Sequence, residues 1–68
     1  MQFHERLQEI RHSRELTQKK VADDNEISIR MYKYMEAGES VPKLDILIRL
    51  ADYYEVSLDY LCGRTDTP

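Results

Sequence analysis

The sequence predicts an all-α fold, a single small domain of five short helices. Apolar residues recur at helical spacing, as at Phe3, Leu7 and Ile10, which lie at i, i+4 and i+7. No segment alternates between apolar and polar residues as a half-buried strand would. A chain of 68 residues allows one domain, and so small a core is stable only if helices pack it efficiently.

Three helices are expected in the first half of the chain. The first begins at Phe3 and ends near His12 or Ser13, where its amphipathic pattern stops. Thr17 and Ser28 are residues of the type that caps helix N-termini, and Gly38 is of the type that ends a helix at its C-terminus. The residues expected to face the core from these helices are Phe3, Leu7, Ile10, Val21, Ala22, Met31, Tyr32 and Met35.

Two more helices are expected in the second half. The fourth runs over residues 44–54, and the fifth is capped by Ser57 and ended by Gly63. The domain core then covers about residues 3–63, and residues 64–68 form a frayed tail. The residues of the fourth helix expected in the core are Leu44, Leu47, Ile48, Leu50 and Ala51.

The most informative stretch covers residues 16–38. It predicts two short helices joined by a polar turn at residues 23–26. The second of these helices carries Arg30 and Lys33, and no acidic residue precedes Glu36. This is the pattern of a helix-turn-helix, which can place one helix in the major groove of DNA.

Charge is distributed unevenly along the chain. The net charge is −3, which by itself argues against a polyanionic partner. However, residues 11–20 hold four basic residues and one acidic residue, whereas residues 45–68 hold two basic and five acidic residues. Because charge is screened within about 10 Å, a local basic face can serve an acidic protein. We therefore expect four cations, Arg14, Lys19, Lys20 and Lys43, to act on DNA phosphates as a collective field.

Other function classes find no support in the sequence. One cysteine, Cys62, allows no internal disulfide and no visible metal-ligand set. There is no nucleophile with a base, no phosphate-cradling loop, no signal peptide and no apolar run of about 20 residues that could span a bilayer. We expect a cytoplasmic, non-enzymatic protein with no cofactor, no metal, no membrane contact and no small-molecule ligand.

From Phe3 to Arg64 the chain resembles the Cro/phage-repressor type of helix-turn-helix, also called the Xre family. The resemblance implies a compact five-helix, lambda-repressor-like domain, with the helix-turn-helix formed by helices two and three. It also implies a homodimer that reads a near-palindromic operator in double-stranded DNA. The matching residues are Leu16-Thr17-Gln18 with Ala22, Ile27-Ser28, Glu36 with Gly38, Pro42 with Leu44, and Val56-Ser57-Leu58-Asp59-Tyr60-Leu61.

The third helix supplies the expected base contacts. Arg30 lies near its start, and an arginine fork pairs well with guanine O6 and N7. Ile29 points the same way and can touch a thymine methyl group. Lys33 and Tyr34 lie one turn further on and can reach a base edge or a phosphate.

Phosphate contacts are expected around the reading helix. In the family, a glutamine at the position of Gln18 contacts phosphate, and Ser28 can cap its helix and touch phosphate as well. The cations expected to contact phosphate are Arg14, Lys19 and Lys43.

The resemblance also concerns the frame of the helix-turn-helix. It implies a structural ion pair between Arg11 and Glu36 that joins helix one to the end of helix three. The chain departs from the family at Asn25 and Glu26, where an apolar residue and a glycine are common. We expect Asn25 to end helix two and Glu26 to be exposed; a positive φ at Glu26 would strain the turn. Lys43 stands where a capping residue is common.

These observations favour a sequence-specific DNA-binding transcriptional regulator, a repressor of phage or mobile-element type, that reads the major groove with the helix Ser28–Met35. The alternative is a protein-interaction module on the same scaffold, antitoxin-like or regulator-binding, with weak or no DNA binding. The net negative charge and the acidic C-terminal half favour that alternative.

Overall fold

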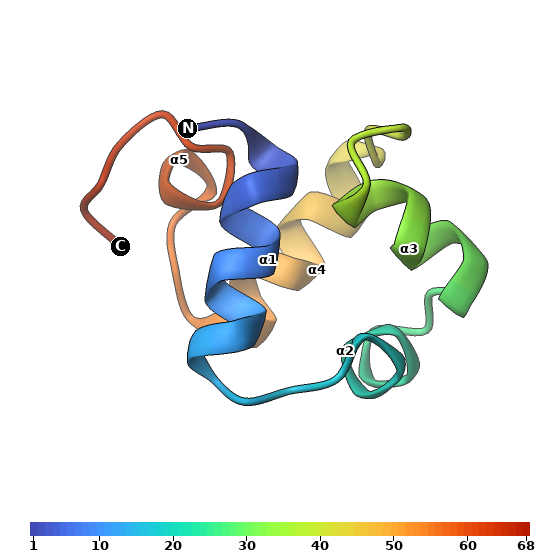
Figure 1. Ribbon diagram of the computed structural model, residues 1–68. Helices are drawn as coiled ribbons and strands as arrows, with labels where there is room; N and C mark the ends of the chain where they lie inside the picture. Colours follow the sequence, from blue (N-terminus) through green and yellow to red (C-terminus); the bar gives the residue numbers. More distant parts are fainter.

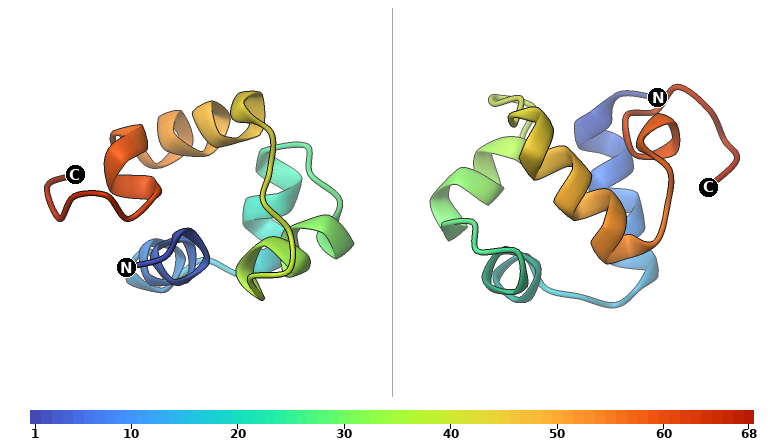
Figure 2. Two further views of the ribbon diagram at one scale, coloured as in Figure 1. Left: turned by 90° about the horizontal axis from the view of Figure 1, so that it is seen from above. Right: turned by 180° about the vertical axis from the view of Figure 1, so that it is seen from behind.

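Five α-helices connected by short loops form the structure, a computed structural model that describes residues 1–68. α5 lies beside the first turns of α1 at one end of the molecule, and α2 and α3 lie at the other end (Figure 1). α4 passes behind α1, and both termini lie on the α5 side (Figure 2). The helices are α1 (Phe3–Ser13), α2 (Gln18–Asp24), α3 (Ile29–Glu36), α4 (Leu44–Tyr54) and α5 (Leu58–Leu61).

Side-chain caps fix where most of these helices begin. The hydroxyl oxygens of Thr17, Ser28 and Ser57 each accept a hydrogen bond from the backbone N–H three residues later. These three predicted caps are confirmed. α4 begins after Lys43, which provides no side-chain cap.

The core is formed by eleven buried apolar residues from all five helices and the loop before α3. Three residues expected in the core lie outside it: Met31 is 46% exposed, Leu44 63% and Ile48 41%. The reason is the 100° turn between successive helical residues. Tyr32 and Met35 fill the inward stripe of α3, so Met31 lies off it. The buried core residues are Leu7, Ile10, Val21, Ala22, Ile27, Tyr32, Met35, Leu50, Ala51, Tyr54 and Leu61.

The turn of the helix-turn-helix is shorter than predicted, because α2 extends to Asp24. Asn25 ends the helix with a φ of −106°, and its buried side-chain amide donates to the carbonyl oxygen of Val21 at 2.8 Å. Glu26 is exposed and has a φ of +57°. The left-handed conformation that favours glycine therefore falls on a glutamate, and the turn is strained.

The C-terminal tail contacts α1 through Asp66. The Arg6 side chain is only 2% exposed, and its Nη2 donates to Oδ1 of Asp66 at 3.0 Å. The guanidinium carbon of Arg6 lies 3.8 Å from the centroid of the Tyr60 ring. The N-terminus runs so close to Gly63 that a Cβ atom there would lie 2.0 Å from the Met1 carbonyl oxygen. The two ends of the chain thus hold each other against α1 and α5.

None of the helices has both the length and the apolar character needed to cross a membrane.

Candidate nucleic-acid interface

α3 turns its basic side outward. Ile29 is 38% exposed and Tyr34 39% exposed, and Arg30 and Lys33 are exposed between them. Glu36, the one acidic residue of α3, is buried instead. The outer side of the helix therefore carries two cations and no anion, and the structure brings all four predicted base contacts to one surface.

Arg30 and Tyr34 contact each other along this outer side. Nε of Arg30 lies 3.4 Å from the Tyr34 hydroxyl oxygen, and its guanidinium carbon lies 5.7 Å from the centroid of the ring. The contact engages Nε and leaves both terminal nitrogens of the fork unoccupied. Those two nitrogens are the donors that pair with guanine O6 and N7.

A buried carboxylate behind α3 holds three helices together. Oε2 of Glu36 accepts from Nε of Arg11 at 2.7 Å and from the Tyr32 hydroxyl at 2.5 Å. Its Oε1 accepts from Nη2 of Arg11 at 3.0 Å and from the Gln18 amide at 3.1 Å. These four bonds fill the acceptor positions of the carboxylate. The ion pair expected between Arg11 and Glu36 is thus present, inside a larger network.

This network sets the protonation of its members. Burial disfavours the charged form of Glu36, but the hydrogen bonds from Arg11, Tyr32 and Gln18 outweigh it and hold the pKa of Glu36 below its usual value of 4.5. Burial, with the bond to Glu36, raises the pKa of Tyr32. Burial also raises the pKa of Tyr54 to about 12, and the hydroxyl of Tyr54 has no hydrogen-bond partner.

Sequence reasoning missed two members of the network. The Tyr32 hydroxyl is one, and its spacing of four residues from Glu36 on the same helix was the available signal. Gln8 is the other; its amide donates to the carbonyl oxygen of Glu36 at 3.0 Å, at the last turn of α3. The Gln8 bond joins α1 to α3, whereas the Tyr32 bond lies within α3 and orients the Glu36 carboxylate.

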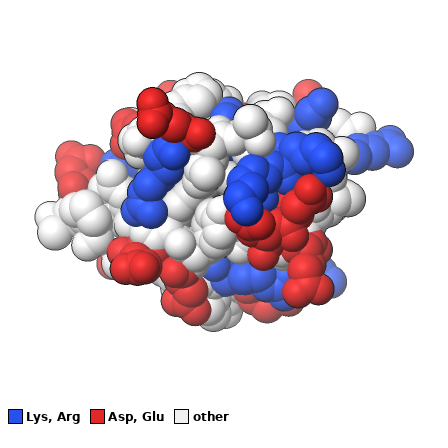
Figure 3. All heavy atoms as spheres, turned by 90° about the horizontal axis from the view of Figure 1, so that it is seen from below, with Lys and Arg blue, Asp and Glu red and all other residues white.

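Three of the four cations expected to act as a collective basic field, Arg14, Lys19 and Lys20, have internal partners. Arg14 donates to the carbonyl oxygen of Tyr54 at 2.6 Å and so closes the end of α4. Lys19 and Lys20 pair with acidic residues of α2. Figure 3 shows the molecule from below, the side on which α2 lies in Figure 1, with basic and acidic side chains beside one another.

The remaining predicted phosphate contacts differ in whether their side chains are already hydrogen-bonded within the protein. The Gln18 amide is bonded to Glu36, and the Ser28 hydroxyl caps α3. Lys43 is exposed and makes no ion pair or side-chain hydrogen bond. Among Arg14, Gln18, Ser28, Lys19 and Lys43, only Lys43 has a side chain without an internal partner.

α4 fastens the C-terminal end of α2. The Tyr53 hydroxyl donates to Oδ2 of Asp24 at 2.6 Å, and Nη1 of Arg49 donates to the carbonyl oxygen of Asn25 at 2.6 Å. The bond from Tyr53, followed by that from Lys20, holds the pKa of Asp24 below its usual value. The helix-turn-helix is thus anchored twice, by the hydrogen bonds of Glu36 to Arg11 and Gln18 and by the bonds from α4 to the end of α2.

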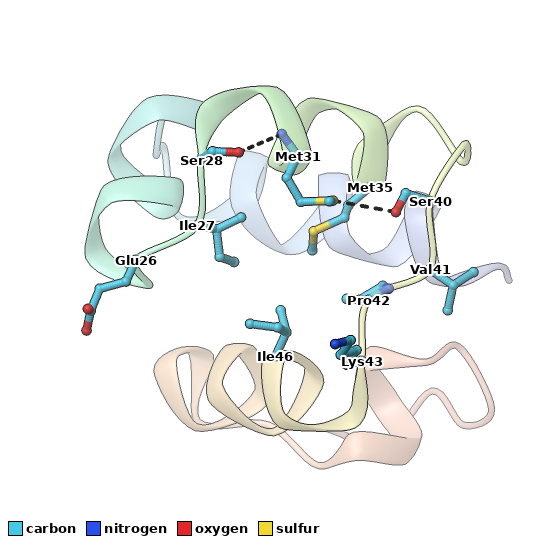
Figure 4. Close-up of a pocket in the computed structure, with 10 residues that line it drawn as sticks. All are labelled: Glu26, Ile27, Ser28, Met31, Met35, Ser40, Val41, Pro42, Lys43 and Ile46. Atoms are coloured by element: carbon cyan, nitrogen blue, oxygen red, sulfur yellow. Dashed lines mark hydrogen bonds between the residues drawn. The ribbon is translucent and has the colours of Figure 1, made fainter.

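A groove of about 430 Å³ lies between α3 and α4 (Figure 4). Ile27, Met35 and Ile46 point into it, while Glu26 and Val41 point away. The loop before α4 forms one wall of this groove.

Comparison with known families matches residues 7–61 to HTH_3, a helix-turn-helix family. This chain belongs to the HTH_3 family. The match confirms the Xre/Cro-like resemblance and the all-α, five-helix, lambda-repressor-like fold. It is a family of helix-turn-helix transcriptional regulators and not of enzymes.

Individual HTH_3 relatives agree in sequence and in structure. The chain is 42% identical over 67 residues to the cryptic phage CTXphi transcriptional repressor RstR of Vibrio cholerae, covering 98% of this chain and 60% of RstR. It is 39% identical to the HTH-type transcriptional regulator YobD of Bacillus subtilis, covering 94% of this chain and 57% of YobD. The chain therefore spans about 60% of the length of these relatives.

A solved structure confirms the arrangement of the helices. The crystal structure of a transcriptional regulator from Listeria innocua superimposes with a TM-score of 0.86 at 34% identity, covering 91% of this chain and 58% of that protein.

Proposed function

We propose that this chain is a sequence-specific DNA-binding transcriptional regulator, a repressor of phage or mobile-element type, that reads the major groove of double-stranded DNA with α3. The observation that carries the proposal is the exposed, acid-free outer side of α3, with Arg30 and Lys33, on a buried frame. The likeness to RstR, itself named a phage transcriptional repressor, supports it.

Each residue of the interface has a proposed role. Arg30 reads guanine, Ile29 touches a thymine methyl group, and Lys33 and Tyr34 reach a base edge or a phosphate. Gln18, Ser28 and Lys43 contact phosphates and set the register of α3. Arg14 and Lys19 serve as phosphate contacts only if they share or leave their internal partners.

The proposal extends to assembly and location. We propose that residues 1–68 form one helix-turn-helix domain and that two copies bind as a homodimer. Their α3 helices would lie about 34 Å apart, one turn of DNA, on a near-palindromic operator. One small module binds weakly, so the second copy supplies much of the affinity. A regulator of this kind acts in the cytoplasm.

Selection of binding sites from random duplexes tests the proposal. We expect an enriched site with a guanine in each half and two-fold symmetry, and binding that weakens steeply with salt. A correctly folded protein that enriches no sequence and binds no duplex at low salt would contradict it.

Replacing Arg30 with alanine tests the assignment of the base contact. We expect Arg30→Ala to cost about 1–3 kcal/mol on the selected site and to relax the preference at one base pair. Lys43→Ala is the matched comparison, because removal of a phosphate-binding cation would weaken binding to all sequences equally. Fluorescence anisotropy on the selected duplex and on single-base variants separates the two patterns. An unchanged base preference in Arg30→Ala would contradict the assignment.

An interaction module on the same scaffold is the second candidate. The groove between α3 and α4, the net charge of −3 and the internally paired cations of α2 favour it. The salt titration separates the two candidates, since an interaction module would show no duplex binding even at low ionic strength.

A further inference from the structure

Both lysines of α2 are paired with acids of the same helix. Nζ of Lys19 lies 2.9 Å from Oδ2 of Asp23, and Nζ of Lys20 lies 3.0 Å from Oδ1 of Asp24. The spacing of four residues stacks each pair on one face of the helix. Because α2 has seven residues, each lysine lies in its first turn and each acid in its last.

This pairing draws the lysine ammonium groups away from the expected DNA contact. Each ammonium group reaches toward the C-terminal end of α2, whereas Gln18, the proposed phosphate contact, lies at the N-terminal end. Asp24 is fixed further by the Tyr53 hydroxyl of α4. Asp23 has no partner besides Lys19, and its side chain is 60% exposed. Of the two pairs, only Lys19–Asp23 has no further hydrogen bond to α4, so a DNA phosphate can compete with Asp23 for Lys19 more easily than with Asp24 for Lys20.

Few cations remain to meet DNA phosphates. Of the ten lysines and arginines, Lys33 and Lys43 make no ion pair or side-chain hydrogen bond, and Arg30 contacts only Tyr34. The sequence-independent part of DNA affinity grows with the number of phosphates that cations neutralise. We therefore expect this part of the affinity to be smaller than ten basic residues would give.

We infer that Asp23 limits the sequence-independent DNA affinity of this chain by holding Lys19 away from the phosphates. The inference rests on the proposed function, and it identifies a residue that sets the electrostatic contribution to DNA binding. Asp23 is a positioning residue, since it acts on DNA through Lys19. Base recognition by α3 then carries a larger share of the affinity than the number of basic residues suggests.

The salt dependence of binding to a random-sequence duplex tests this inference. Asp23→Asn keeps the size of the side chain and removes its charge, which frees Lys19. We expect the slope of log K against log salt to become steeper by about 0.9 per copy and affinity at low salt to rise about tenfold. A purely structural role for Asp23 would change stability and leave this slope unmoved.

Two variants complete the experiment. Asp45→Asn makes the same change of net charge at an exposed residue of α4 that has no ion pair, and it should leave the slope unchanged. Lys19→Gln added to Asp23→Asn should return the slope to the wild-type value. Equal slopes for Asp23→Asn and Asp45→Asn, or a gain that survives Lys19→Gln, would overturn the inference while the proposed function stands. Absence of duplex binding by every folded variant would overturn the proposed function, and this inference with it.

Discussion

Two buried tyrosines near the Glu36 network differ in the hydrogen bonding of their hydroxyl groups. Both are fully buried, but the Tyr32 hydroxyl donates to Glu36, while the Tyr54 hydroxyl has no partner. The four acceptor positions of the Glu36 carboxylate are already filled, so it cannot accept from Tyr54. A buried hydroxyl without a partner costs free energy, whereas a bonded one stabilises.

We therefore predict opposite effects for the same chemical change at these two positions. Tyr32→Phe should lower the free energy of unfolding by about 1–3 kcal/mol, because a charge-assisted hydrogen bond is removed inside the core. Tyr54→Phe should leave it unchanged or raise it, because no hydrogen bond is removed. Urea denaturation at pH 7 measures both. Equal destabilisation of the two variants would show that the Tyr32 bond contributes nothing beyond packing.

Acid should release the Glu36 network. The pKa of the Glu36 carboxyl lies below the usual 4.5 in the folded chain, so the ionised carboxylate stabilises the fold at pH values above 4.5. That contribution disappears as the pH falls below 4.5 and through the lowered pKa. The ¹³C shift of the Glu36 carboxyl should titrate with a midpoint below 4.5, and Glu36→Gln should weaken the acid dependence of unfolding. Asp24 shifts in the same direction, so part of that dependence should remain. A Glu36 midpoint at or above 4.5 would be incompatible with the network.

At the scale of elements, the helix ends carry the main local strain. Glu15, Glu26 and Glu55 follow α1, α2 and α4 with φ values of +55°, +57° and +57°. Such a φ is easy for glycine and costs about 1–2 kcal/mol for other residues. The chain has only two glycines, and they take the same conformation after α3 and α5.

Glu26→Gly should therefore stabilise the helix-turn-helix. The side chain of Glu26 is exposed and makes no ion pair, so its loss removes only the strain. We expect a gain of about 1 kcal/mol, which is about 4–8 °C in the midpoint of thermal unfolding for a domain of this size. Glu26→Ala removes the same side chain without freeing the backbone and serves as the control. A midpoint for Glu26→Gly no higher than that of Glu26→Ala would refute the strain.

Local signals determine how far the sequence predicts this structure. Caps such as Ser28 and Ser57 act within one turn of helix, so they could be placed from sequence alone, as could the outer side of α3. Leu44 and Ile48 are exposed because another side of α4 packs against the neighbouring helices. The local sequence pattern does not specify which side packs. Pairs such as Arg6 with Asp66 join residues 60 apart in sequence. The spacing of four residues between Lys19 and Asp23 predicts their ion pair, whereas the net charge of residues 11–20 does not reveal it.

At the scale of the whole molecule, the contacts between the chain ends lie away from the proposed DNA surface. The terminal contacts of Arg6 lie at the α5 end, while α2 and α3 lie at the opposite end (Figure 1). Most cations serve the fold: Arg11 and Arg14 bond to other helices, and Arg49 bonds to the turn after α2. An acidic chain can thus present a small basic surface at α3, where Arg30 and Lys33 are exposed and no acidic residue accompanies them.

An NMR titration of the ¹⁵N-labelled chain with the selected duplex tests the central claim most directly. If α3 enters the major groove, the largest changes in amide chemical shift should lie in α3, at Gln18 and near Lys43, and the ends of the chain around Arg6 should stay unchanged. Changes confined to α4, α5 and the terminal contacts, or no changes with the fold intact, would contradict the claim.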